Sequence, residues 1–351
     1  MKFLIIRFSS IGDIVLTTPV IRCLKKQILT AELHYLTKPA FAGILEANPY
    51  LDRLHLLKDD LNETIREMRE QDFDYIIDLH HNLRTFRVKW GLSKKSFSFP
   101  KLNIEKWLIT ALKIDRLPRS HIVDRYMKTV ESFGVRNDGA GLDYFIPDSE
   151  KIKEKDIPAS HHLGYIGIVI GAAHFTKKFP IEKLKTLCAN IDHPVILLGG
   201  QQDRTDGEEI ANMDPVKIYN ACGKFSLHES ADLVRRAKLI ISNDTGFMHV
   251  AAAFKRPLIS IWGNTIPEFG MYPYYGDLFS KTLQAQGRTL SAFSETMEVK
   301  GLSCRPCSKI GHDKCPKRHF KCMRLQNDQE IEEKIYQYLN RLPKDQATIG
   351  F

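Results

Sequence analysis

The chain has 351 residues and no apolar run close to the ~20 residues that a membrane-spanning helix needs. The apolar stretch at its start, residues 1–7, is too short for a signal peptide and leads into polar serines instead of a small-residue cleavage site. Two nucleotide-binding sequences are also missing, G-x-x-x-x-G-K-[ST] and G-x-G-x-x-G, which weighs against a P-loop nucleoside triphosphatase and a simple nicotinamide-dependent enzyme. We therefore expect a cytoplasmic protein with a ligand site of another kind.

Signals for nucleic-acid binding are scarce as well. The sequence has no paired zinc knuckles, no RNP-type strand and no basic low-complexity tail. Its 51 Lys and Arg residues against 42 Asp and Glu residues give a net charge of +9, and the basic residues concentrate around 84–128 and 301–324. We expect no nucleic-acid partner, because this charge fits an anionic small molecule or a peripheral contact with an anionic membrane face.

Apolar strands alternate with amphipathic helical stretches, which is typical of an α/β protein with parallel sheets. The charged stretch 146–160, with two prolines, interrupts the alternation and predicts a linker. We expect an N-terminal domain over 1–150, a C-terminal domain over 160–325, and a closing helix within 326–351 that packs back toward the N-terminal domain. The predicted strands are 2–8, 32–36, 51–57, 75–79, 165–170, 195–198, 216–219, 239–242 and 258–262, with 263–329 largely irregular.

Gly12 and Asp13 come shortly after the first predicted strand, behind the pair of serines Ser9 and Ser10 and one isoleucine. Open α/β sheets bind their ligands at the carboxyl ends of the strands. A carboxylate there could accept a proton from an attacking hydroxyl group, which makes Asp13 a candidate general base. A helix-capping role for Asp13 is the alternative.

A second turn of the same kind, residues 242–246, follows a strand in the second half. The backbone amides of Thr245 and Gly246 would point at a phosphate, helped by the helix dipole. Asp244 would repel that phosphate unless it contacts sugar hydroxyls or amides. His249, about one turn into the helix, either touches the same ligand or is an ordinary packed histidine.

Two further loops follow strands in the same way. Thr176, Lys177 and Lys178, in the loop 171–180, could neutralise a leaving diphosphate, or they belong to a solvated basic loop. His80 and Arg84 follow the fourth strand and could bind an anionic acceptor, or they form a solvated polar loop behind a capping Asp78.

Four of the seven cysteines cluster near the C-terminus as Cys304-x2-Cys307-x7-Cys315-x6-Cys322. A C-x2-C pair is half of a common zinc site, and four thiolates suit tetrahedral zinc. The later spacings are irregular, so the sequence leaves open a structural zinc ion and a set of unligated or redox-active thiols.

Taken together, these motifs resemble glycosyltransferase family 9, the ADP-heptose:lipopolysaccharide heptosyltransferases. The resemblance spans nearly the whole chain and implies the GT-B architecture, with two Rossmann-like domains whose parallel sheets face a central cleft. It rests on Arg7 to Pro19, Asp78 to Arg84, His121 with Asp124 to Tyr126, Ser242 to Gly246 with His249, Arg256-Pro257 and Gly263 to Pro267.

The resemblance also implies a reaction, an inverting and metal-independent transfer of heptose from ADP-heptose to the inner core of lipopolysaccharide. In that scheme Asp13 is the base, and the enzyme works in the cytoplasm or peripherally at the inner membrane. The implied donor-binding residues are Thr176, Lys177, Lys178, Asp203, Asp244, Thr245, Gly246 and His249, and the implied acceptor-binding residues are Ser10, Gly12, His80 and Arg84.

Two alternatives keep the same fold. One is a transferase that uses another nucleotide sugar for a different surface glycan, and the other is a nucleotide-sugar-binding protein without turnover.

Overall fold

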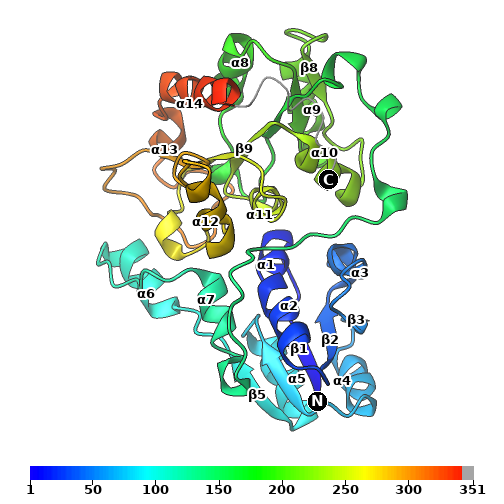
Figure 1. Cartoon of the computed structure of the whole chain (residues 1–351). Helices are drawn as coiled ribbons and strands as arrows, with labels where there is room; N and C mark the ends of the chain where they lie inside the picture. Colours follow the sequence, from blue (N-terminus) through cyan, green and yellow to red (C-terminus); the bar gives the residue numbers. More distant parts are fainter. Residues whose placement is uncertain (342–351) are drawn as a thin grey trace.

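The computed structural model describes residues 1–341, which form two α/β halves, each built on one parallel sheet (Figure 1). The first sheet has the strand order β3-β2-β1-β4-β5, and the second has the order β11-β10-β9-β6-β7-β8. The strands of the first sheet are β1 (Lys2–Ile6), β2 (Glu32–Thr37), β3 (Arg53–Leu56), β4 (Tyr75–Asp78) and β5 (Lys95–Ser98). Those of the second are β6 (Ile166–Val169), β7 (Val195–Leu198), β8 (Ile218–Asn220), β9 (Leu239–Asn243), β10 (Leu258–Trp262) and β11 (Ser294–Glu298).

Helices connect these strands in both halves. The first half contains α1 (Ile11–Val15), α2 (Thr18–Gln27), α3 (Gly43–Glu46), α4 (Leu61–Glu70), α5 (Leu83–Leu92), α6 (Asn103–Trp107) and α7 (Ile122–Met127). The second contains α8 (Ile181–Asn190), α9 (Arg204–Ala211), α10 (Leu227–Arg236), α11 (Gly246–Ala253), α12 (Asp277–Ala285), α13 (Lys321–Arg324) and α14 (Asp328–Arg341). No helix among residues 1–341 is long and apolar enough to cross a membrane.

The central strands are buried along almost their whole length. β6 and β7 have no exposed residue, and in β1 only Lys2 reaches the surface. Continuous apolar strands of this kind suit a parallel sheet covered by helices on both faces. The predicted α/β fold with two parallel sheets is therefore confirmed.

Several predicted elements differ from the observed ones. The chain after β1 forms two helices, α1 and α2, instead of one continuous helix, and Pro19 takes the second position of the new helix α2, where its missing N–H costs nothing. The stretch 263–329 is less irregular than expected, since it holds α12 and the edge strand β11. Helix α5 and strand β5 were not predicted at all.

The prediction that the closing helix returns to the N-terminal domain is wrong for the described part of that helix. α14 packs beside α8 in the second half, where Lys183 of α8 pairs with Asp328 (Nζ to Oδ1, 2.7 Å). Ile331 and Ile335 of α14 join the apolar core of the second sheet, and this burial fixes the position of the helix. The remainder of the predicted segment, 342–351, lies outside the described residues.

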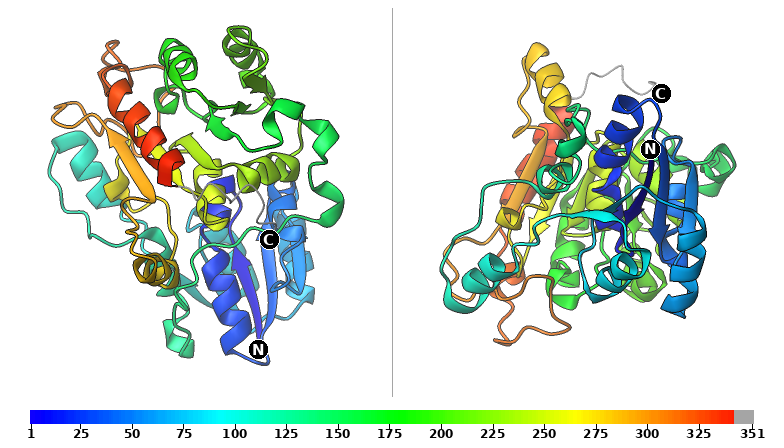
Figure 2. Two further views of the ribbon diagram at one scale, coloured as in Figure 1. Left: turned by 45° about the horizontal axis from the view of Figure 1, so that its top comes forward. Right: turned by 90° about the horizontal axis from the view of Figure 1, so that it is seen from below.

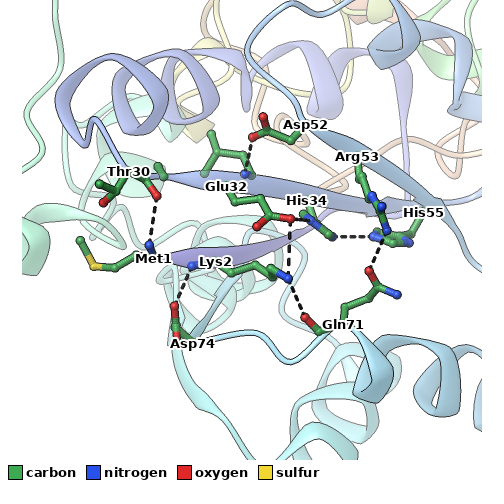
Figure 3. A network of polar contacts seen from close by, with 12 residues as sticks. Met1, Lys2, Thr30, Glu32, His34, Asp52, Arg53, His55, Gln71 and Asp74 are labelled. Atoms are coloured by element: carbon green, nitrogen blue, oxygen red, sulfur yellow. Dashed lines mark hydrogen bonds and ion pairs between the residues drawn. The ribbon is translucent and has the colours of Figure 1, made fainter.

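A polar network joins β1, β2 and β3 near the amino ends of β1 and β2, away from the loops that follow the strands (Figure 3). His34 is hydrogen-bonded to Glu32 and to His55, each at 2.8 Å, and Lys2 Nζ lies 3.6 Å from Glu32. Burial lowers the pKa of His55 to about 4, so the ring is neutral at pH 7. These contacts tie β1, β2 and β3 together and are structural.

Each sheet has one place where neighbouring strands lead their connections to opposite sides, between β1 and β4 and between β6 and β9. Ligands of open α/β sheets bind at these switch points. The four loops singled out in the sequence follow these four strands, so the topology gathers them at two adjoining edges.

The two switch points meet through a close contact between α1 and α11. Figures 1 and 2 show α1 of the first half next to α11 of the second. A Cβ atom on Gly12 would lie 2.6 Å from Cδ2 of His249 and 3.2 Å from Cα of Gly246. A Cβ on Gly246 would lie 2.8 Å from Cβ of Ile11. Only glycine at both positions lets the helices approach this closely.

Replacing Gly12 with alanine should therefore loosen the contact between the halves. We expect Gly12→Ala to lower the free energy of unfolding by about 1–3 kcal/mol, since side-chain or backbone atoms must move to admit the methyl group. Chemical denaturation measures this loss. Gly43→Ala is the matched control, because its new Cβ would meet only Nε2 of His228 at 3.7 Å, an ordinary contact. Equal losses in the two variants would contradict the close-contact interpretation.

Candidate active site

Asp13 lies in the first turn of α1 and is held by two groups from its own loop. Its Oδ1 lies 2.6 Å from Nη2 of Arg7, and its Oδ2 accepts hydrogen bonds from the hydroxyl and the backbone N–H of Ser10 at 2.8 and 3.2 Å. Burial would raise the pKa of Asp13, but Arg7 and the Ser10 hydrogen bonds outweigh it and keep that pKa below its usual range. The carboxylate is therefore ionised and fixed in orientation at pH 7.

Arg7 is itself anchored from several sides. Its Nε donates to the carbonyl oxygen of Ser9 at 2.7 Å, and its Nη1 donates to the carbonyl of Leu79 at 2.6 Å and to the hydroxyl of Tyr126 at 3.1 Å. The guanidinium thus links the loop after β1 to the loop after β4. Because Arg7 is fixed, the carboxylate of Asp13 is held in one orientation, as a group that takes part in catalysis must be.

A pocket of about 340 Å³ opens beside this loop. Two of its lining residues, His80 and Arg84, are those expected to bind an acceptor, and Lys38 adds a second cation. Burial lowers the pKa of His80 to about 4, so its ring is neutral at pH 7 and the positive charge of the pocket comes from Lys38 and Arg84. The pocket is lined by Phe8, Ser9, Lys38, His80, Asn82, Leu83 and Arg84.

Sequence reasoning missed three cations: Lys38, which lines the pocket, and Lys101 and Lys106, which lie near the candidate base. Lys101 and Lys106 lie close enough to Asp13 to interact with it electrostatically. Burial, followed by the charge of Arg125, lowers the pKa of Lys106 to about 8. The only signal in the sequence was the excess of basic residues after position 84, which did not single out a particular lysine.

On the other side of the contact, Lys177 lies beside the start of α11. Its Nζ is 2.6 Å from Oδ2 of Asp244, and the hydroxyl of Thr265 donates to the same oxygen at 2.8 Å. Thr245 is the N-cap residue of α11 and makes no side-chain capping bond. The first amides of α11, from Gly246 onward, are therefore not capped by the Thr245 side chain and lie next to a cation.

Lys178 points elsewhere, although its neighbour shares the loop. Its Nζ lies 2.5 Å from Oδ1 of buried Asp203, whose Oδ2 accepts from the backbone N–H of Gly200 at 2.9 Å. Asp203 thus caps the turn after β7. Thr176 is buried as well, and its hydroxyl accepts from the N–H of His312 at 2.8 Å, which ties the loop to the cysteine-rich segment.

His249 is a packed residue at the contact between the halves. Its ring touches the backbone at Gly12, and burial lowers its pKa to about 4. Its Nδ1 is buried and has no hydrogen-bond partner within the described residues. Asp78 is likewise structural, since it accepts from the N–H groups of His80 and His81 and pairs with Lys89.

The four clustered cysteines line one small cavity with Asn264 and His319. Burial raises the pKa of Cys307, and raises that of Cys322 to about 12, so these thiols are protonated. Across residues 1–341, no group of three or more His, Cys, Asp or Glu side chains is placed to hold a metal ion. The geometry thus gives no support to a zinc ion, one of the two alternatives that the sequence left open for these cysteines.

The site therefore combines an oriented carboxylate on one wall with a cation and a helix N-terminus on the other. Such an arrangement can remove a proton from an attacking group and stabilise negative charge on a departing one. It brings together Ser10, Gly12, Asp13, Lys177, Asp244, Thr245, Gly246 and His249, keeps His80 and Arg84 at the adjacent pocket, and places Thr176, Lys178 and Asp203 in supporting contacts.

The chain is similar in sequence to known glycosyltransferases. The family model described as glycosyltransferase family 9 (heptosyltransferase) matches residues 62–287. Lipopolysaccharide heptosyltransferase 1 of Campylobacter coli is 28% identical over 292 residues, covering 76% of this chain and 84% of that protein.

Two solved structures have the same fold. A family 9 glycosyl transferase from Veillonella parvula aligns with a TM-score of 0.74 and 22% identity, covering 97% of this chain and 98% of that one. The ADP-heptose lipopolysaccharide heptosyltransferase II of E. coli aligns with a TM-score of 0.70 and 18% identity over 97% and 99%. The chain belongs to glycosyltransferase family 9, the heptosyltransferase family, and is a glycosyltransferase with two Rossmann-like domains.

Proposed function

We propose that this chain transfers heptose from ADP-heptose to the inner core of lipopolysaccharide, with inversion at the anomeric carbon and without a metal ion. The observation that carries the proposal is the position of ionised Asp13 opposite Lys177 and the amino end of α11. The names of the relatives, lipopolysaccharide heptosyltransferases and an ADP-heptose-dependent enzyme, supply the donor and the acceptor.

The proposed reaction is a single displacement. The acceptor hydroxyl gives its proton to a carboxylate oxygen of Asp13 while its oxygen forms a bond to the anomeric carbon. The bond between that carbon and the diphosphate oxygen breaks, and its electron pair leaves with ADP. Attack and departure on opposite faces of the sugar invert the configuration.

Charge on the leaving diphosphate would be stabilised by Lys177 and by the amides of Thr245 and Gly246. Lys177 pairs with Asp244 in the described structure, so the incoming diphosphate would take over one partner of that pair. Asp244 is then available to the sugar or ribose hydroxyls. A cation and a helix dipole supply the positive charge that other transferases obtain from a divalent metal.

On the acceptor side, Lys38 and Arg84 would hold an anionic group of the lipopolysaccharide core in the 340 Å³ pocket. Because that acceptor is anchored to a lipid, we also propose that the enzyme works peripherally at the cytoplasmic face of the inner membrane. The domain division at 146–160 remains a prediction, supported by the three short 3₁₀ turns between residues 148 and 161.

The first prediction about the reaction concerns the base. We expect Asp13→Asn to reduce kcat by about 10²–10⁴-fold, since the amide cannot accept the proton. Release of ADP from ADP-heptose, with heptose-deficient core as acceptor and EDTA present, measures the rate. Asp60→Asn is the matched control, because Asp60 is a capping carboxylate at the start of α4. Similar small losses in both variants would leave Asp13 only a capping role.

The same assay tests the substrate and the metal. Turnover with a UDP- or GDP-sugar and not with ADP-heptose would retain the fold and overturn the donor. A rate that EDTA abolishes and a divalent ion restores would contradict the metal-free displacement.

A second prediction concerns pH. The Ser10 hydroxyl is one of the groups that lower the pKa of Asp13, so Ser10→Ala should raise that pKa. The base is active when deprotonated, and the acid limb of the kcat/KM profile should therefore move to higher pH in the variant. A profile measured with brief exposure to acid, alongside circular dichroism, checks this. An acid limb at the same pH in both proteins would mean that protonation of Asp13 does not control kcat/KM.

The third prediction separates the two neighbouring lysines. Lys177→Ala should weaken ADP binding by about tenfold or more, the loss of one charged contact. Lys178→Ala should leave ADP binding near the wild-type value and lower the melting temperature more than Lys177→Ala does, because the Asp203 side chain that it leaves unpaired is 1% exposed against 11% for Asp244. Calorimetric titration with ADP and thermal unfolding of both variants decide between them. Reversed behaviour would assign the diphosphate to Lys178.

A further inference from the structure

Helix α5 has an apolar outer face that none of the described residues covers. Leu83, Phe86 and Trp90 are 84%, 61% and 78% exposed, and their spacing of three and four places them along one side of the helix. The opposite side is fixed, because Val88 and Leu92 belong to an apolar core cluster of the first half. The helix is therefore firmly seated while three large apolar side chains face outward.

The start of α5 is also fixed in place. The side chain of Asn82 accepts from the N–H of Thr85 at 3.0 Å, and the Thr85 hydroxyl accepts in turn from the N–H of Asn82 at 2.9 Å. This capping box, together with burial of Thr85, holds the first turn rigidly. The exposed face is a built feature of the fold and not a frayed end.

The chain segment that carries the apolar face has charge of one sign. Residues 79–104 contain six Lys and Arg residues and no Asp or Glu. Arg84 and Arg87 lie on the exposed side of α5 itself, and Lys94 and Lys95 follow it, also exposed. Lys89 pairs with Asp78 and Lys94 with Asp72, which leaves Arg84, Arg87 and Lys95 without an acidic partner among the ion pairs of the described residues.

The exposed face runs directly into the acceptor pocket. Leu83 and Arg84 line the 340 Å³ pocket and also form the first turn of α5. Whatever covers Phe86 and Trp90 therefore lies next to the mouth of this pocket. Figure 1 shows α5 in the first half, with β5 beside it and far from α14.

We propose that the α5 face, defined by Leu83, Phe86, Arg87 and Trp90, inserts into the headgroup region of an anionic phospholipid bilayer. Aromatic and aliphatic residues interleaved with arginines are typical of a helix that lies in the plane of a membrane interface. Basic side chains add attraction to anionic headgroups. The inference rests on the proposed function, because it would hold the acceptor pocket at the surface from which a lipid-anchored acceptor projects.

Vesicle flotation tests the surface without any substrate. We expect the protein to float with vesicles of equal parts phosphatidylcholine and phosphatidylglycerol, to bind pure phosphatidylcholine weakly, and to detach partly at high salt because screening weakens the electrostatic part. The double variant Phe86→Ser/Trp90→Ser should lose about tenfold or more in vesicle partitioning. Arg87→Glu should mainly lower the preference for the anionic lipid.

The matched control is Leu163→Ser/Val216→Ser, which removes two apolar side chains that are 79% and 74% exposed in the second half. It should float like the wild type. Equal losses in the two double variants, or wild-type flotation of Phe86→Ser/Trp90→Ser, would overturn the proposal. So would a wild-type dimer in solution that dissociates in Phe86→Ser/Trp90→Ser, because a second copy would then cover the face.

Activity with two forms of the acceptor separates this inference from the proposed function. Phe86→Ser/Trp90→Ser should keep wild-type kcat/KM for a delipidated core oligosaccharide and lose about tenfold for the same core in vesicles. Equal losses with both acceptors would contradict the membrane role. If the wild type transfers heptose to neither acceptor, the proposed function fails, while the flotation result still decides whether the α5 face binds lipid.

Discussion

The close approach of α1 and α11 is the constraint on which the rest of the site depends. Gly12 and Gly246 let two helix amino ends from different sheets meet closely, with the His249 ring and the Ile11 side chain packed against the two glycines. One helix carries Asp13 and the other starts beside Lys177, so this contact holds the proposed base near the proposed diphosphate site. A single methyl group at either glycine would push the two functions apart.

Ion pairs then fix the charged groups before any substrate arrives. Arg7 orients Asp13, and Asp244 holds Lys177. The Lys178–Asp203 pair ties the loop 171–180 to the turn after β7. Fixed charges of this kind need little reorganisation during reaction, which is the physical advantage of a preorganised site. In the proposed reaction Lys177 would exchange Asp244 for phosphate, which would couple donor binding to a local rearrangement.

Sequence patterns predicted the strands well where burial is continuous, as in β1, β6 and β7. They failed at α5, because Leu83, Phe86 and Trp90 form an apolar stripe that faces outward and mixes with the inward Val88 and Leu92. Periodicity cannot distinguish an apolar side chain in a core from one that awaits a membrane or a partner. Strand β11 was missed because its sequence, SETME, is largely polar.

The sequence alone determined the family, through several motifs that resemble glycosyltransferase family 9, and it predicted the site at loops that follow strands, where open α/β sheets bind ligands. Tertiary structure was needed to assign different roles to residues of the same type. Lys177 and Lys178 are adjacent in sequence yet bind different aspartates, and His249 fills the contact between the halves. Side-chain direction and long-range neighbours decide such roles, and these follow from how the two sheets pack together, which local sequence does not encode.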